Sequence, residues 1–340
     1  MNELKGLRVV VAGAGAIGSV AALVLARRGA EVLLADPAFP GDNASGVAAG
    51  MLAPACEALL DSQAAGHFPL LRDARDAWER LLPDLAQALD RSGAILQAPE
   101  PQAVLARAEA AGMAVEPISE AEARRRVPGL GAAGPFLFTP EDWRLEPQAM
   151  LEALRGQLIA AGGAVARKDV RDLAHGVDVV IEATGPGRGD LKPIKGQILR
   201  FPGAGPRHGP VVRGEGVYVA PSAEGAVAGA TMEEGRSDRE IDPAAVARLA
   251  AGARRLFPAL EAARVEARAG VRAATPDGLP LVGPGEGEGT MAAQVLVARG
   301  ARRNGWLLAP LVAEVLLDRL AGRPVSAAAA AFDPTRFRAG

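Results

Sequence analysis

The feature that most constrains the fold of this chain is a glycine pattern near its N-terminus. Gly13, Gly15 and Gly18 take the glycine positions of G-x-G-x-x-G within "GAGAIG", directly after the apolar segment "LRVVVA". In this pattern the first glycine permits a tight turn, the second lets the backbone approach a pyrophosphate, and the third allows a helix to pack closely against a strand. We therefore expect a strand, a helix and a parallel strand over residues 7–36, with the phosphates of a dinucleotide at the N-terminus of the helix.

An acidic residue stands where a dinucleotide fold needs one. Asp36 ends the expected second strand, eighteen residues after Gly18. A carboxylate there accepts hydrogen bonds from the ribose hydroxyls of an adenosine and repels a 2′-phosphate, so NADP is disfavoured. Taken alone, "GAGAIG" could also be a small-residue helix cap in an alanine-rich protein. The strand, the helix and the carboxylate together indicate binding of an ADP moiety, but they do not separate FAD from NAD.

The rest of the chain mixes helical segments with one block of strands. Apolar residues recur at helical spacing between residues 70 and 126 and again over 150–166, whereas residues 197–235 have strand patterns separated by glycine and proline. We expect an α/β fold in which a Rossmann-like domain is interrupted by a smaller α+β domain with an antiparallel sheet. The expected Rossmann-like domain comprises residues 1–86, 143–196 and 265–340, and the smaller domain residues 87–142 and 197–264. The alanine run 327–331 is expected to be a loosely held tail.

Composition argues against several classes of function. The 340 residues carry a formal net charge of −2, which gives no general attraction to nucleic acid or to an anionic membrane. The single cysteine, Cys56, cannot form an internal disulfide, and the three histidines, His67, His175 and His208, lack metal-ligand spacing. Residues 9–26 carry no charge and resemble a membrane anchor in length, but their three glycines at motif spacing favour nucleotide binding. We expect a cytoplasmic protein that binds no metal, nucleic acid or membrane.

A run of small and apolar residues, "ASGVAAGMLAP" over 44–54, follows the expected second strand after a short loop. An NAD-binding domain has no need of such a segment. The ribityl chain and ring system of FAD extend beyond its ADP part, and only small side chains let the backbone approach them. The segment therefore favours FAD, although an alanine-rich piece of core is the alternative. If it binds the flavin, a bulky residue at Ala49 or Gly50 is expected to cost flavin affinity far more than stability.

Five stretches resemble one family in the same order along residues 9–322. These are the "GAGAIG" motif, "ASGVAAGML", "GVYVAPS" followed by "GATM", "AGVRAATPDGLPLVG", and "GARRNGWLLAP". Together they resemble the FAD-dependent D-amino-acid oxidase superfamily, and within it the glycine oxidases of thiamine biosynthesis. The resemblance implies that the Rossmann-like domain binds FAD and that the smaller domain binds the substrate.

The resemblance implies a set of residues that hold FAD. In chain order they are the glycines of the first motif with Ala16 and Ile17, then Asp36, Ala44, Ser45, Ala49, Gly50, Met51, Val170, Ala301, Arg302, Arg303, Asn304, Gly305, Trp306 and Leu307. The flavin is expected to be non-covalent, because the C-terminal motifs contain no cysteine.

The resemblance also implies the substrate site. Arg272 would pair with the substrate carboxylate, Arg303 would lie beside the substrate, and Tyr218, Met232 and Met51 would complete the pocket. An arginine fork suits a carboxylate because it offers two parallel charge-assisted hydrogen bonds. The alternatives are a surface ion pair for Arg272 and ordinary core packing for the tyrosine and the methionines.

Three differences from the family pattern bear on the substrate. Ala301 and Arg302 stand where relatives often have a histidine and an aromatic residue, and Ala273 stands where they often have proline. Arg302 could also take the place of Arg303. The shape and polarity of the pocket therefore stay open.

The function implied is oxidative deamination of glycine or a small D-amino acid. A hydride would pass from Cα to flavin N5, O2 would be reduced to H2O2, and the product would serve thiazole synthesis in thiamine biosynthesis. Orientation and electrostatics suffice for such a step. Two alternatives stay open, namely a dehydrogenase of D-amino acids or secondary amines that passes electrons to a carrier, and a non-catalytic dinucleotide-binding subunit. The expected partners are a small amino acid and O2, and a homo-oligomer is left open.

Overall fold

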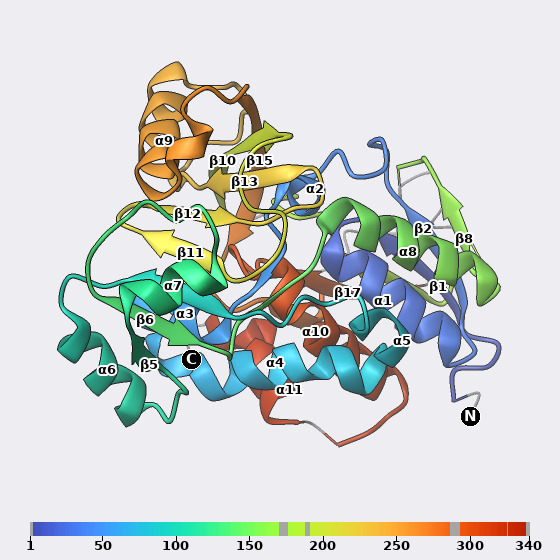
Figure 1. The fold of residues 1–340 in the computed structure, drawn as a ribbon. Coiled ribbons are helices and arrows are strands. Elements are labelled where there is room, and N and C mark those ends of the chain that lie inside the picture. Colours follow the sequence, from blue (N-terminus) through green and yellow to red (C-terminus); the bar gives the residue numbers. More distant parts are fainter. Residues whose placement is uncertain (1–2, 170–175, 188–190, 286–292, 325, 338–340) are drawn as a thin grey trace.

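The computed structural model describes residues 3–169, 176–187, 191–285, 293–324 and 326–337 (Figure 1). Its α/β architecture contains a largely parallel sheet and a largely antiparallel one, which confirms the expected fold class. Figure 1 shows the parallel sheet with α1 and α8 at the right, and the second sheet beneath α9 at the upper left. Among the described helices, none is both long and apolar enough to cross a membrane.

In the described part of the chain, the first sheet has six strands in the order β16-β17-β9-β1-β2-β8. Neighbouring strands run parallel, except that β16 is antiparallel to β17. The bounds of these strands are Arg8–Ala12 (β1), Glu31–Ala35 (β2), Ala164–Ala166 (β8), Val179–Glu182 (β9), Leu281–Pro284 (β16) and Gln294–Arg299 (β17).

The expected strand, helix and parallel strand at the N-terminus are present. Helix α1 (Ala16–Arg27) joins β1 to β2, and all but two of its residues are buried. It contacts α8 (Pro147–Ala160) and α10 (Gly305–Leu320), so it is covered on both sides. The charge-free stretch 9–26 is therefore apolar because it forms an inner strand and a central helix of the core.

The second sheet follows the order β14-β10-β13-β12-β11-β4-β6-β5 among described residues, and β15 pairs with β10 beside that path. Its pairings are antiparallel, apart from the parallel pair of β4 and β11. The bounds are Ala94–Gln97 (β4), Glu116–Ile118 (β5), Phe136–Thr139 (β6), Lys192–Pro202 (β10), Val211–Gly214 (β11), Val217–Ala220 (β12), Gly225–Gly229 (β13), Glu233–Glu234 (β14) and Glu266–Ala274 (β15). Helices α9 (Pro243–Leu256) and α7 (Glu120–Arg126) pack on one face of this sheet and bury an apolar core there.

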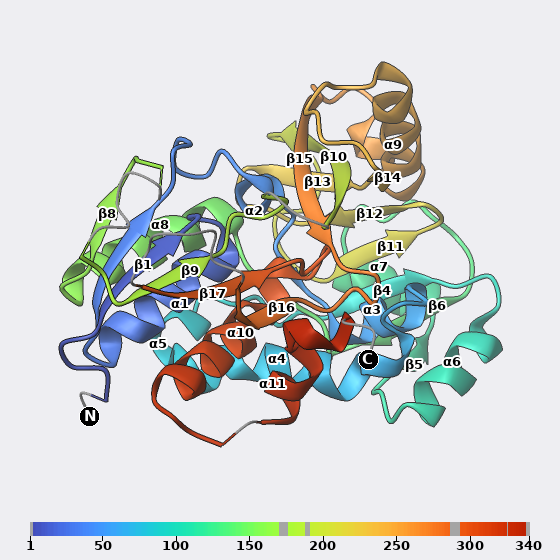
Figure 2. The same cartoon turned by 180° about the vertical axis from the view of Figure 1, so that it is seen from behind.

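The division into two domains stays a prediction, but sheet membership differs from it at two strands. Residues 192–196, expected in the Rossmann-like domain, form the first part of β10 in the second sheet. Residues 266–274 were assigned to the Rossmann-like domain, whereas the strand β15 pairs along its whole length with β10 of the second sheet. Figure 2 shows β15 rising from the region of β16 and β17 into that sheet. The strand therefore connects the two sheets physically, which brings residues near its end between them.

The remaining elements link and cover the sheets. They are α2 (Ala44–Val47), β3 (Met51–Leu52), α3 (Pro54–Leu60), α4 (Phe68–Leu81), α5 (Pro83–Ala86), α6 (Pro101–Ala110), β7 (Trp143–Arg144) and α11 (Ala327–Phe332). The expectation of a loose tail at 327–331 is wrong. Ser326 caps α11 by accepting the Ala329 N–H at 3.1 Å, and Phe332 is fully buried in the first core, so the alanine run is held at both ends.

Candidate active site

The glycine turn after β1 is shaped by close backbone approach. Gly13 has a φ of +105°, and a Cβ on it would overlap the carbonyl of Ala183. A Cβ on Gly18 would overlap the carbonyl of Gly13. Gly15 is the N-cap of α1, in extended conformation, and the first turn of the helix carries no acidic residue. The N-terminus of α1 therefore offers its N–H groups and its dipole to an anion.

Asp36 fixes the same turn. Its two carboxylate oxygens accept the N–H groups of Ala14 at 2.8 Å and of Ala38 at 2.9 Å. Each oxygen has a further lone pair for a ligand hydroxyl. Ser45 connects α2 to the turn, because its Oγ accepts the Ala16 N–H at 2.9 Å.

A cavity of about 350 Å³ opens beside this turn, at the carboxyl ends of β1, β9 and β17. That edge of a parallel sheet is where dinucleotides bind. The lining includes these residues expected to hold the cofactor: Gly13, Gly15, Ala16, Ile17, Asp36, Ala44, Ser45, Ala301, Arg302, Arg303, Gly305 and Trp306. It also includes Ala183 and Thr184, which the sequence analysis did not single out, although their "EATGPG" turn follows a buried strand as the first motif does.

A second cavity of about 710 Å³ lies against the face of the antiparallel sheet opposite to α9. It is lined by Ala49, Gly50, Met51, Tyr218, Met232 and Asn304, among others. Both cavities share Ala44, Ala48, Arg272, Arg303 and Trp306 as lining residues, so they form one continuous cleft. An elongated ligand such as FAD fits this arrangement, with its phosphates at the glycine turn and its ring system toward the second cavity.

Arg272 stands where the two cavities meet. Its guanidinium lies over Gly196 of β10, where any Cβ would overlap it. It donates to the carbonyl of Thr231 at 3.3 Å and lies 3.4 Å from the sulfur of Met232. No carboxylate of the described residues forms an ion pair with it. Burial lowers the pKa of Arg272, but an arginine keeps its charge in proteins, so this guanidinium is a charge without a counterion.

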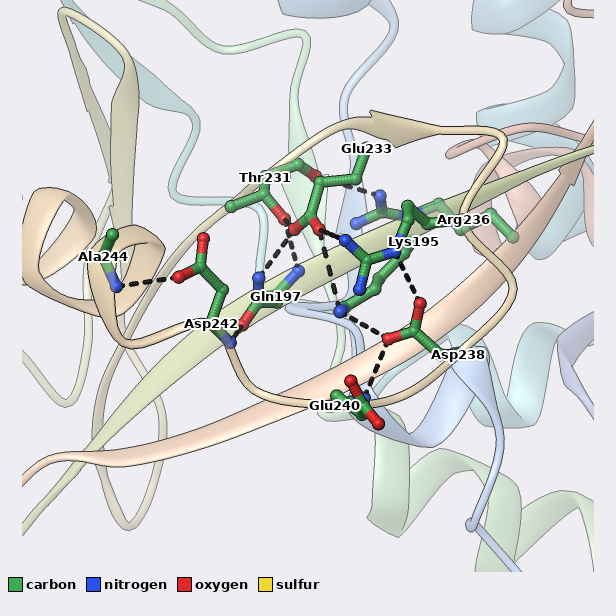
Figure 3. A network of polar contacts seen from close by, with 10 residues as sticks. Lys195, Gln197, Thr231, Glu233, Arg236, Asp238, Glu240, Asp242 and Ala244 are labelled. Carbon is green, nitrogen blue, oxygen red and sulfur yellow. Dashed lines mark hydrogen bonds and ion pairs between the residues drawn. The ribbon is translucent and has the colours of Figure 1, made fainter.

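Thr231, whose carbonyl accepts a hydrogen bond from Arg272, belongs to a polar network (Figure 3). The backbone N–H of Gln197 donates to Thr231 Oγ1 at 2.8 Å, and its side chain donates to Glu233 at 2.6 Å. Lys195, whose side chain is fully buried, pairs with Asp238 at 2.7 Å. Lys195, Gln197, Glu233 and Asp238 were not predicted from the sequence. A lysine and a glutamine within the apolar strand "IKGQIL" were the available signal.

Arg302 and Arg303 both have carboxylate partners. Arg303 Nε donates to Glu57 at 2.5 Å, and Arg302 pairs with Asp61. Burial alone raises the pKa of Asp61, but the hydrogen bond from Arg302 and the charge of Arg303 hold that pKa below its ordinary value. Arg303 therefore lines the second cavity with its charge neutralised by Glu57, whereas Arg272 has no such carboxylate partner among the described residues.

Tyr218 and Met51 line the second cavity on different elements. A Cβ on Gly229 of β13 would lie 2.7 Å from the Tyr218 hydroxyl, so the phenol crosses that glycine. Burial raises the pKa of Tyr218, so the phenol stays neutral. The sulfur of Met51 lies 3.4 Å from Nη2 of Arg213, another buried arginine that the sequence analysis did not single out. Its signal was one charge inside the apolar strand "VVRG".

Some expected cofactor residues have other surroundings. Gly50 has a φ of +75°, and a Cβ on it would overlap the carbonyl of Leu145. Its small size is therefore a packing requirement, which corrects the expectation that a larger residue there would spare stability. Leu307 is fully buried in the first core and lines neither cavity, and Val170 lies outside the described residues.

Comparisons with known proteins agree with this geometry. The family described as "DAO: FAD dependent oxidoreductase" matches residues 8–319. A Rhizobium etli protein named "Putative thiamine biosynthesis oxidoreductase ThiO" is 32% identical over 343 residues, covering 92% of this chain and 96% of that protein. The crystal structure of glycine oxidase from Geobacillus kaustophilus has a TM-score of 0.79 at 24% identity, covering 98% of this chain and 100% of that one.

A third relative has a different name. The tRNA 5-methylaminomethyl-2-thiouridine biosynthesis bifunctional protein MnmC of Caulobacter sp. is 31% identical over 354 residues, covering 93% of this chain but 55% of that protein. This chain thus spans about half the length of that bifunctional relative. The family resemblance of the sequence motifs and the expectation of FAD are confirmed by the match over residues 8–319. This chain belongs to the DAO family of FAD-dependent oxidoreductases.

Proposed function

We propose that this enzyme oxidises glycine or a small D-amino acid, with O2 as the electron acceptor. For glycine, the overall reaction consumes one O2 and one water and yields glyoxylate, ammonia and H2O2. The name of the Rhizobium etli relative supports a role in thiamine biosynthesis, where the product would enter thiazole synthesis.

The observation that carries this proposal is the charge of Arg272. A half-buried guanidinium without a carboxylate partner among the described residues faces a cavity that continues into the dinucleotide cavity. A substrate carboxylate would supply the missing counterion through two parallel hydrogen bonds. The neutral phenol of Tyr218 lines the same cavity and can donate a further hydrogen bond.

The oxidation step itself does not require an acid or base side chain of the protein. FAD, when bound, supplies the two-electron acceptor. Arg272 would fix the carboxylate and thereby the orientation of the Cα–H bond, while the cavity walls limit the size of the side chain. The amine nitrogen would lose its proton to solvent at the open side of the cavity.

The test is peroxide release by the FAD-loaded protein with glycine, sarcosine and D-alanine. Peroxide formed in step with oxygen uptake supports the proposal. Reduction of an artificial electron acceptor without oxygen uptake would indicate the dehydrogenase alternative. Absence of turnover with all three amines under both conditions would refute amino-acid oxidation.

A second candidate comes from the bifunctional relative named for tRNA modification. Its name suggests oxidation of an amine attached to a tRNA base. The net charge of −2 gives this chain no general attraction to tRNA, so we rank this function lower. Turnover of an aminomethyl-uridine compound at rates above those of glycine would reverse the ranking.

A further inference from the structure

The second cavity contains another arginine besides Arg272. Arg213 lies on β11 and is only 9% exposed, yet its side chain lines this cavity. It is paired in register with Tyr218 of the antiparallel strand β12. Directly opposed residues of two strands point to the same face of a sheet. Arg213 and Tyr218 therefore project together into the space where the substrate is proposed to bind.

The guanidinium of Arg213 has weak partners. Its Nη2 lies 3.4 Å from the sulfur of Met51, and a thioether is a weak acceptor. Its Nε is buried without any hydrogen-bond partner. No carboxylate in the described ranges lies within ion-pair distance of it. A buried guanidinium whose donors are unfilled favours the binding of an anion.

The carboxylates whose charges act on Arg213 are already engaged elsewhere. Glu57 accepts from Arg303 at 2.5 Å, and Asp142 accepts the N–H of Ala55 at 2.9 Å at the start of α3. They stabilise the charge of Arg213 at longer range, but they do not occupy its donors. Glu215, which also lines the cavity, is exposed at the surface.

On the cavity face of the sheet, Tyr218 lies between the two arginines. Ile198, Gly229, Tyr218 and Arg213 are opposed in register across β10, β13, β12 and β11, so they form one row on the cavity face. The side chain of Arg272 approaches this row from the other end, over Gly196. Three strand spacings, about 14 Å, separate the backbones of β10 and β11. Both arginine side chains line the same cavity of about 710 Å³, so an anion that enters it meets two guanidinium groups.

We propose that the substrate is an amine with two carboxylates, one held by Arg272 and the other by Arg213. The inference rests on the proposed function and narrows its substrate class. The second carboxylate is carried either by the substituent on nitrogen, as in iminodiacetate, or by Cβ, as in D-aspartate. Iminodiacetate, O2 and water would give glyoxylate, glycine and H2O2, with one C–N bond broken. D-Aspartate, O2 and water would give oxaloacetate, ammonia and H2O2.

The test compares pairs of amines that differ in one carboxylate. Sarcosine is the monoanionic partner of iminodiacetate, and D-asparagine is the neutral-side-chain isostere of D-aspartate. We expect the wild type to have the higher kcat/KM for the dicarboxylate in at least one pair. In Arg213→Met the ratio of dicarboxylate to partner falls about 10- to 100-fold, because one charge-assisted interaction is lost.

Two further variants control this measurement. Arg213→Lys keeps the charge without the fork and should keep part of the ratio. Arg264→Met removes an arginine whose side chain is 78% exposed outside the cavity, and it should leave the ratio unchanged. If Arg213→Met does not fold, the proposal is judged from the ratio of kcat/KM for dicarboxylate and partner in the wild type and in Arg213→Lys. A wild type that prefers the monoanionic partner in both pairs, or a folded Arg213→Met with an unchanged ratio, overturns the proposal.

A binding measurement separates this proposal from the proposed function. Calorimetry with succinate and propionate, which carry no amine to be oxidised, reports on the two arginines without turnover, because the carboxylates of succinate are spaced as in D-aspartate. Tighter binding of succinate that is lost in Arg213→Met supports the second anion site even if no amine is oxidised. Equal binding of succinate and propionate contradicts it even if glycine is a substrate.

Discussion

At the scale of single residues, the arginines of the cleft differ in what neutralises them. Arg302 and Arg303 are paired with Asp61 and Glu57, whereas Arg272 has only a carbonyl and a thioether beside it. A paired arginine organises its surroundings, while an unpaired one favours the binding of an anion. The distinction cannot be read from "GVRAATPDG" and "GARRNGW", because the partners lie in α3 and directly after it, more than two hundred residues away.

Arg272→Met should therefore affect substrate use more than cofactor binding. Loss of a charge-assisted pair is worth about 1.5–3 kcal/mol, or about a 10- to 100-fold lower kcat/KM for glycine. Steady-state peroxide release measures this, and the flavin absorbance of the purified variant checks that FAD is retained. An unchanged kcat/KM would show that the carboxylate binds elsewhere.

Gly50→Ala tests why the segment 44–54 is built from small residues. The methyl group would meet the Leu145 carbonyl, and φ would stay near +75°. We expect the free energy of unfolding to fall by about 1–3 kcal/mol, measured by urea denaturation without FAD. Gly112→Ala is the matched control, since its φ is +66° and nothing lies within 4 Å of its Cβ. Equal losses in both variants would mean that the Leu145 contact contributes nothing.

At the scale of elements, the strand β10 supports the site from its far side. Its residues alternate, so Gly196 faces Arg272 in the cavity. Lys195 and Gln197 face the segment that carries Thr231 and Glu233 (Figure 3). This segment presents Met232 to the arginine. The polar network thus holds the segment that carries Met232 against β10, and so helps to fix the position of Met232 in the cavity.

Thr231→Val should weaken the contact between this segment and β10. It removes the acceptor for the Gln197 N–H and the donor to Glu233, so we expect a loss of about 1–3 kcal/mol in unfolding free energy and a higher KM. Chemical denaturation and steady-state kinetics measure the two effects. Thr335→Val, at an exposed threonine that donates to Asp333, is the control and should change neither. An unaltered KM would show that the network does not position the site.

The difference in unfolding free energy between the wild type and Thr231→Val should depend on pH. Burial alone would raise the pKa of Glu233, but its bonds from Thr231 and Gln197 and the charge of Lys195 hold that pKa below 4.5. A carboxyl with a lowered folded pKa stabilises the protein above its unfolded pKa and loses this contribution as the pH falls through the folded value. The stability gap between wild type and Thr231→Val should therefore narrow below pH 4.5. A gap that widens on acidification would contradict this account.

Sequence patterns predicted the elements whose signals are local. The first strand, the helix and the second strand followed from "LRVVVAGAGAIG" and from Asp36, because the turn, the helix start and the ribose carboxylate lie within thirty residues. The pairing of β15 with β10 was not predictable, since "EARAGVRAA" carries no period that selects one sheet over the other. The role of Arg213 was not predictable either, because its neighbours Met51 and Tyr218 come from different elements.

At the scale of the whole molecule, the cleft joins two separate cores. The first cavity belongs to the parallel sheet and the second to the antiparallel sheet, and β15 runs between them. A ligand that fills both cavities contacts both cores at once. FAD should therefore contribute to the stability of the entire chain and not only to that of the dinucleotide-binding part.

Thermal unfolding with graded ligands measures this contribution. A ligand that binds only the folded state adds about 2.7 kcal/mol at a concentration of one hundred times its Kd. FAD should raise the Tm most, because it reaches both cavities, and ADP should raise it less, because it fills only the cavity beside Asp36. NADP should have the smallest effect, since its 2′-phosphate meets that carboxylate. If ADP at saturation stabilised the protein as much as FAD, the ring system would make no net contact with the second cavity, and the proposed position of the substrate beside Arg272 would have to be abandoned.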